Sequence, residues 1–323
     1  KLGGILEIYE KFQGVDPRST PMKIFPAVHY SMGGLWVDYE RSPSGGMVEG
    51  SPRNQQTSIP GLYAIGECDY QYHGANRLGA NSLLSCIFSG LFVAPTLAAV
   101  ATGRGGAADR RPFDAALRRE EERHRALLAR TGGTENPYDL HQELGSLMTR
   151  VATVVRRNEQ LAAAYGEVCD MEERWRRCGL SDSGNWTNQN VVFTKALGDM
   201  FPVAKLILKG ALLRDECRGA HYKPDFAMPG IAATDPAGKR REAEQWCDRF
   251  AENTTRWLKS TIAKCDADGN PQISYQDVDT SLIPPRPRLY GLVGAETIEE
   301  VWKERQAAGQ AGPRAGAAVA AGT

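Results

Sequence analysis

The 323-residue sequence has no excess of charge, because its 39 basic and 39 acidic side chains cancel. This balance excludes a protein that is drawn electrostatically to nucleic acid or to an anionic membrane surface. No two of the seven cysteines have the C-x2-C spacing of a zinc or redox site, and their number is odd. The thiols therefore indicate a reduced compartment in which most of them act as small core residues.

Long hydrophobic runs are also scarce, and one uncharged stretch from Leu78 to Gly103 stands out. Its length is sufficient for a membrane-spanning helix. Pro95 interrupts it, and Asn81 and Ser82 supply a helix cap at its apolar start. We therefore expect the buried core helix of a globular protein rather than a membrane span.

The pattern of apolar residues changes along the chain from mixed to mainly helical. Before residue 107 we expect one short helix, then short strands and turns, including a buried strand over 62–65 that is bounded by glycines. After a glycine-rich linker, the spacing of apolar residues predicts an amphipathic helical bundle. The predicted helices cover 3–12, 113–128, 140–165, 170–178, 203–216, 246–259 and 297–305, and a further strand covers 272–275.

The segment His73-Gly-Ala-Asn-Arg-Leu-Gly-Ala-Asn-Ser-Leu83 contains the main candidate site. Arg77 lies in a loop of small residues, and its planar guanidinium suits a two-pronged grip on a carboxylate, although it could also cap backbone carbonyls. Asn81, Ser82 and Leu83 open the apolar helix, whose positive end stabilises an anion; Ser82 could equally be a simple N-cap. Glu67 follows Gly66 at the end of the predicted strand, where α/β folds place ligand-binding groups.

Two histidines accompany this segment. His29 lies ahead of the flexible Gly33-Gly34 pair, and a lone histidine of this kind is usually structural. His73 could orient Arg77, contact a ligand or pack the loop. If His29 and Arg77 grip one small diacid, their polar tips should converge on a common hollow, roughly 5–10 Å apart.

Two further segments look unremarkable as binding motifs. The segment from Glu216 to His221 ends a predicted helix with a glycine stop and cations, which is ordinary capping chemistry. Asp266-Ala-Asp-Gly-Asn270 suggests a calcium loop, but Pro271 occupies the required glycine position, so a turn is predicted.

Four motifs occur in one order: HYSMGG from His29, GLYAIGE from Gly61, HGANRLGANSLL from His73 and ECRGAHYKPDF from Glu216. Together they resemble the flavoprotein subunit of succinate dehydrogenase and fumarate reductase, and the resemblance runs from residue 1 to about 305. HYSMGGLWVDYE and GECDY point to the Gram-positive, menaquinone-linked branch. The resemblance implies FAD as cofactor, succinate and fumarate as substrates, and no metal site. It implies that the carboxylates are bound by His29 and Arg77, and that FAD is contacted by Glu67, Asn81, Ser82 and Leu83.

The same resemblance implies an α/β + α fold, in which a partial FAD-binding (Rossmann-like) domain precedes a helical bundle domain and a small α+β C-terminal domain. The implied boundaries are 1–28 for the end of a capping domain, 29–107 for the FAD domain, 108–230 for the helical domain, 231–308 for the small domain and 309–323 for a disordered tail. The implied partners are an iron–sulfur subunit and a membrane cytochrome b anchor, which would hold the protein peripherally at the cytoplasmic face of the cell membrane.

The sequence departs from this family in what it does not contain. There is no G-x-G-x-x-G, and the family's flavin-attaching histidine and proton-shuttle arginine are expected upstream of Lys1. We therefore expect the C-terminal part of such a subunit, inactive by itself. Cys217 stands where the family usually has serine. An enzyme resembling L-aspartate oxidase and a non-catalytic structural fragment remain as alternatives.

Overall fold

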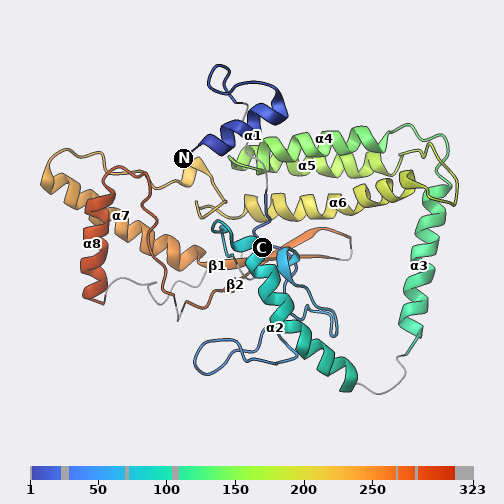
Figure 1. Ribbon diagram of the computed structural model, residues 1–323, viewed down its shortest axis with the longest axis horizontal. Coiled ribbons are helices and arrows are strands. Elements are labelled where there is room, and N and C mark those ends of the chain that lie inside the picture. The colour runs from blue at the N-terminus through green and yellow to red at the C-terminus, as the bar shows by residue number, and fades with distance from the viewer. Residues whose placement is uncertain are drawn as a thin grey trace.

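The computed structural model describes residues 2–22, 29–69, 73–103, 109–266, 268–280 and 283–309. Three helices lie side by side, two more pack together elsewhere, and a β-hairpin runs beneath the three-helix layer (Figure 1). The helices are α1 Gly3–Gln13, α2 Asn81–Gly103, α3 Arg111–Leu128, α4 Pro137–Ala152, α5 Asn158–Trp175, α6 Gln189–Leu212, α7 Pro236–Trp257 and α8 Ala295–Ala307. Short 3-10 turns cover η1 Gly66–Cys68 and η2 Pro224–Phe226, and the strands are β1 Lys259–Cys265 and β2 Pro271–Asp277.

The three-helix layer of α4, α5 and α6 contains the larger core. Leu140, Leu161 and Phe201 are fully buried in it, and each such side chain contributes about 1.5–3 kcal/mol. Gly198 on α6 permits close packing, since a Cβ there would lie 2.4 Å from the Trp175 ring of α5. The predicted bundle is therefore confirmed as a helical core. The predicted helices over 140–165 and 170–178 are wrong in their bounds, because the chain breaks between α4 and α5 and α5 continues without interruption to Trp175.

Helix α6 begins fourteen positions before the predicted start at Val203. Its start follows Asn188, whose side chain accepts a hydrogen bond from the Val191 amide, as an N-cap does. Pro202 lies inside the helix, although a proline in a sequence normally predicts that a helix is broken there. Packing of α6 against α5 and α4 outweighs that local cost.

A second core joins α7 and α8. Asp235 caps α7 by accepting from the Gly238 amide, and Trp246, Phe250 and Trp302 form a stacked and edge-to-face aromatic group. The hairpin β1–β2 follows α7 directly and packs on α6. The strand around 272–275 was predicted, whereas its partner β1 was not; the Asp266 turn between them is confirmed as a turn, held by Asp268 and Asn270 amides on the Asp266 carboxylate.

Residues 29–69 contain isolated bridges rather than a sheet. The bridges pair Leu35 with Asp69, Arg41 with Met47 and Gln56 with Tyr63. The predicted strand over 62–65 is wrong for the described structure, in which β1 and β2 form the single sheet. Leu62 and Ile65 are 49% and 42% exposed, because no neighbouring strand covers them among the described residues. The α/β character expected here is thus reduced to turns and bridges.

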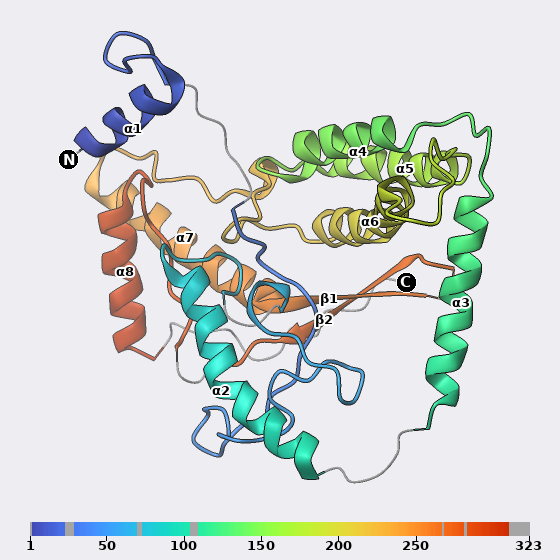
Figure 2. The same ribbon diagram turned by 45° about the vertical axis from the view of Figure 1, so that its right-hand side comes forward.

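Helix α2 is exposed, so the expectation of a buried core helix is wrong for this structure. By length and composition it is the one helix among the described residues that could cross a membrane, and 17% of its most apolar window is buried. Ser85, Ser89 and Val93 face inward, while Leu83 and Leu91 are 73% and 74% exposed. The turned view in Figure 2 shows α2 projecting away from the three-helix layer. Residues 310–323 of the predicted disordered tail lie outside the described part of the chain.

Candidate functional site

The structure brings His29 and Arg77 into direct contact. Arg77 Nη2 lies 3.0 Å from His29 Nδ1. Because a guanidinium only donates, His29 Nδ1 is the acceptor and the ring proton resides on Nε2. Arg77 also donates to the Leu78 carbonyl at 3.3 Å, and its guanidinium lies 5.4 Å from the centre of the Tyr30 ring. The two side chains converge as the sequence suggested, although without the ligand-sized gap between their tips.

Tyr30, His73 and Ser85 hold this pair in place. The Ser85 hydroxyl donates to the Ser82 carbonyl at 2.7 Å, and so it is available as an acceptor for the Tyr30 hydroxyl at 3.3 Å and His73 Nε2 at 3.2 Å. Tyr30 is buried and meets the His73 ring edge-to-face at 5.0 Å. Sequence reasoning missed Tyr30 and Ser85. The sequence signal that could have identified Ser85 is its spacing of four residues from Ser89, which places two polar side chains on one face of an otherwise apolar helix.

Glu67 connects the His29 segment to η1. Its carboxylate accepts from the Ser31 amide at 3.0 Å, and its side chain remains largely exposed. Gly66 makes this placement possible, because its φ is +71° and a Cβ there would lie 3.0 Å from Cys86 Sγ on α2. The Glu67 carboxylate therefore contacts the His29 segment, while the neighbouring Gly66 packs against α2.

Asn81, Ser82 and Leu83 form the first turn of α2. Ala80, with a φ of +65°, redirects the chain immediately before this turn. The first amides of a helix lack intrahelical acceptors and carry partial positive charge. Since Ser85 ties this end of α2 to Tyr30 and His73, the positive end lies beside the His29–Arg77 pair. The positive end of the helix suits an anionic group, the exposed Leu83 suits an apolar one, and the Glu67 carboxylate can accept hydrogen bonds from hydroxyl groups.

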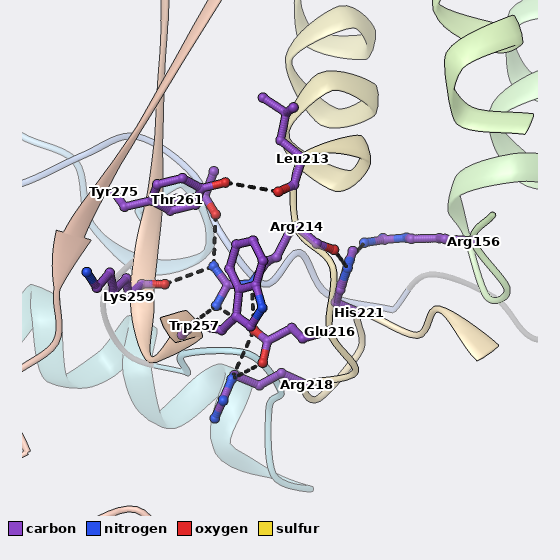
Figure 3. Close-up of polar contacts among 10 residues, drawn as sticks. All are labelled: Arg156, Leu213, Arg214, Glu216, Arg218, His221, Trp257, Lys259, Thr261 and Tyr275. Carbon is purple, nitrogen blue, oxygen red and sulfur yellow. Dashed lines mark hydrogen bonds and ion pairs between the residues drawn. The ribbon is translucent and has the colours of Figure 1, made fainter. Parts of the chain in front are cut away.

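A charged cluster follows the end of α6, and Figure 3 shows its polar contacts. Glu216 is 2% exposed and accepts from Arg214 at 2.7 Å and from Arg218 at 2.9 Å. Arg214 also donates to the carbonyls of Lys259 and Trp257. The cluster was interpreted from sequence as ordinary helix capping, and that interpretation missed its contact with the candidate site. The Ala220 amide donates to the Ala75 carbonyl, at 2.9 Å, inside the His73–Arg77 loop.

His221 is held neutral within this cluster. Its Nδ1 lies 2.7 Å from Arg156 Nη1 and must accept, so Nε2 carries the proton and donates to the Arg214 carbonyl at 2.8 Å. Burial, followed by the positive charge of Arg156, lowers the pKa of His221 to about 4.

This pKa predicts a loss of stability in mild acid. The unfolded chain binds the proton near the ordinary pKa of 6.5, before the folded chain does. The free energy of unfolding should therefore fall as the pH is lowered from about 6.5 to about 4. Urea midpoints across this range should decline less in His221→Gln than in the parent chain. His124→Gln, at an exposed position on α3, should keep the parent's decline, and parallel curves for all three would contradict the prediction.

Two hollows on the surface lie away from this site. One of about 260 Å³ is lined by Arg286–Tyr290 with Glu299 and Trp302, and one of about 480 Å³ by residues of α4. Within the described ranges no group of three histidine, cysteine or carboxylate side chains could hold a metal ion.

Comparison with known proteins identifies similar chains. Residues 1–83 match the family described as an FAD binding domain, and residues 141–290 match the fumarate reductase flavoprotein C-terminal family. The succinate dehydrogenase flavoprotein subunit of Bacillus subtilis is 44% identical over 90% of this chain and 44% of its own length. The fumarate reductase flavoprotein subunit of Escherichia coli is 30% identical over 90% of this chain and 42% of its own.

A solved structure of Escherichia coli quinol fumarate reductase has a TM-score of 0.68 with this chain. The two are 29% identical, and the match covers 89% of this chain and 43% of that one. The chain thus spans less than half the length of the relatives that it matches. These likenesses confirm the family resemblance that the four motifs indicated.

Proposed function

Because this chain is homologous to the flavoprotein subunits of succinate dehydrogenase and fumarate reductase, we propose that it forms the C-terminal part of such a subunit. The complete subunit would interconvert succinate and fumarate with FAD. The single observation that carries the proposal is the contact between His29 and Arg77, two groups from separate segments, at 3.0 Å beside the start of α2.

His29 and Arg77 bind the carboxylates of the substrate in this proposal. The guanidinium of Arg77 can hold one carboxylate through two parallel hydrogen bonds. In the tautomer described above, His29 carries its proton on Nε2 and can donate it in a hydrogen bond to the other carboxylate. Tyr30 and Ser85 keep both side chains oriented through the contacts to His73 and α2.

Glu67, Asn81, Ser82 and Leu83 contact FAD in this proposal. When bound, FAD supplies the two-electron acceptor that the oxidation of succinate requires. The positive end of α2 stabilises negative charge beside it, and Glu67 accepts hydrogen bonds from hydroxyl groups. The chain's own contribution is to orient the diacid and to fix that electrostatic environment.

The wider assignments follow from the same homology. We assign residues 1–28 to the end of a capping domain, 29–107 to the FAD domain, 108–230 to the helical domain and 231–308 to the small C-terminal domain. The proposed partners are an iron–sulfur subunit and a membrane cytochrome b anchor, which would place the subunit peripherally at the cytoplasmic face of the membrane. The similar solved structures include quinol–fumarate reductases, one of them with menaquinol molecules, which supports a quinone-linked assembly.

Substrate preference tests the proposal. The complete subunit that contains these residues should reduce an artificial electron acceptor with succinate, because two carboxylates fit His29 and Arg77 together. L-aspartate should support a rate at least about tenfold lower, because an ammonium group then approaches the positively charged Arg77. Steady-state rates with both acids, at equal flavin content, provide the measurement. Faster turnover of L-aspartate would favour the oxidase alternative, and no turnover of either acid would favour a structural role.

A further inference from the structure

The turn formed by Arg218, Gly219, Ala220 and His221 touches the loop that contains Arg77. The Ala220 amide donates to the Ala75 carbonyl at 2.9 Å. Gly219 lies so close to the same carbonyl that a Cβ on it would come within 2.1 Å of the oxygen. Its φ of +58° is also a conformation that favours glycine. This position in the turn is therefore restricted to glycine by both its conformation and its neighbour.

The turn itself is rigidly held. Arg218 and His221 exchange both backbone hydrogen bonds, at 2.9 and 3.0 Å. Buried Glu216 binds Arg218 on one side and Arg214 on the other, while His221 is fixed by Arg156 and by the Arg214 carbonyl. Arg214 in turn is anchored to the end of α7 and to β1. Figure 3 shows these contacts converging on the segment after α6.

The loop on the other side of the contact is short and tightly turned. Ala75 is two residues before Arg77, and the Asn76 amide closes a turn onto the His73 carbonyl at 3.2 Å. Arg77 Nε is buried without a hydrogen-bond partner, so the position of this guanidinium depends on its backbone and on its Nη contacts. A displacement of the Ala75 carbonyl is therefore transmitted directly to Arg77.

We infer that the 216–221 turn is a positioning element for the carboxylate-binding arginine, with Gly219 and Ala220 setting where Arg77 lies. The inference rests on the proposed function of Arg77 and adds that the helical domain controls its geometry. None of these turn residues is assigned a contact with substrate; they act through the Ala75 carbonyl. The affinity for a dicarboxylate should then depend on a residue more than a hundred positions away from the loop.

Gly219→Ala in the complete, flavin-loaded subunit tests this inference. The added Cβ must move about 1 Å away from the Ala75 carbonyl to reach an ordinary contact. A displacement of this size predicts that the Kd of malonate, a non-reacting dicarboxylate, rises at least about tenfold. Flavin absorbance changes during titration give the Kd, and the flavin content should equal that of the parent.

Gly132→Ala is the matched control, because Gly132 has a φ of +72° and open space where its Cβ would lie. It introduces similar backbone strain without a clash, and its malonate Kd should stay within about twofold of the parent. Glu216→Gln removes the charge that holds Arg214 and Arg218 with little change of shape. It should raise the Kd by at least about threefold, and it decides the question if Gly219→Ala does not fold.

The outcomes separate the two proposals. Normal malonate binding in the parent, with Gly219→Ala equal to Gly132→Ala, would overturn this inference alone. If Gly219→Ala cannot be purified in folded form, a folded Glu216→Gln variant with the parent's malonate Kd would likewise overturn this inference. A flavin-loaded parent without dicarboxylate affinity would overturn the proposed function and this inference with it.

Discussion

Replacing Arg77 with lysine is expected to lower turnover by the complete flavoprotein subunit about 100-fold at saturating succinate. Lysine keeps the positive charge but loses the planar, two-pronged geometry of the guanidinium. It also loses the fixed contact with His29, so the carboxylate can shift by about 1 Å, which is enough for a loss of this size. Stopped-flow or steady-state rates of flavin reduction by succinate measure the effect.

Arg118→Lys provides the control, since Arg118 is an exposed arginine on α3 and lies outside the candidate site. Its turnover should equal that of the parent. The melting temperatures of both variants should lie close to the parent value, because Arg77 is not part of a core cluster. Turnover of Arg77→Lys within about threefold of the parent would contradict the role of Arg77 in carboxylate binding.

The 323-residue chain by itself is expected to be purified without bound FAD. In the proposed site, Glu67 and the first turn of α2 would contact the cofactor from one side only. The apolar side chains Leu83, Leu84 and Leu91 of α2 are 73%, 62% and 74% exposed. A cofactor held on one side gains too little to offset its loss of motion and the ordering of the loops around it. Visible absorbance of the purified chain, with added FAD removed by gel filtration, gives the stoichiometry.

The complete subunit, prepared in the same way, is the control and should retain flavin. A yellow 323-residue chain that carries close to one FAD per molecule would contradict this prediction. It would also mean that α2 and Glu67 suffice for tight binding. The exposed face of α2 would then have to close over the cofactor, which hydrogen exchange of the α2 amides with and without FAD would detect.

Helices with regular apolar spacing were predictable from the sequence, and their limits were less so. The bundle core and the helices near residues 113–128 and 297–305 follow from a period of 3.6. The start of α6 was misplaced because Pro202 gives a local stop signal that packing against α5 overrides. The strand expected over 62–65 is reduced to a single antiparallel bridge between Tyr63 and Gln56, because the described residues provide no longer ladder of hydrogen bonds to extend it.

The sequence by itself determined which side chains are candidates for the proposed chemistry. These candidates could be identified locally, because each depends only on its neighbours in the chain: Arg77 lies in a loop of small residues, Asn81 starts a helix, and Glu67 follows a glycine. Only the tertiary structure decided what these groups touch. Three hydrogen bonds join segments that are distant in the sequence. They link Arg77 to His29, His73 to Ser85, and the Ala220 amide to the Ala75 carbonyl. No local pattern encodes such contacts, since they arise from how the separately formed elements pack.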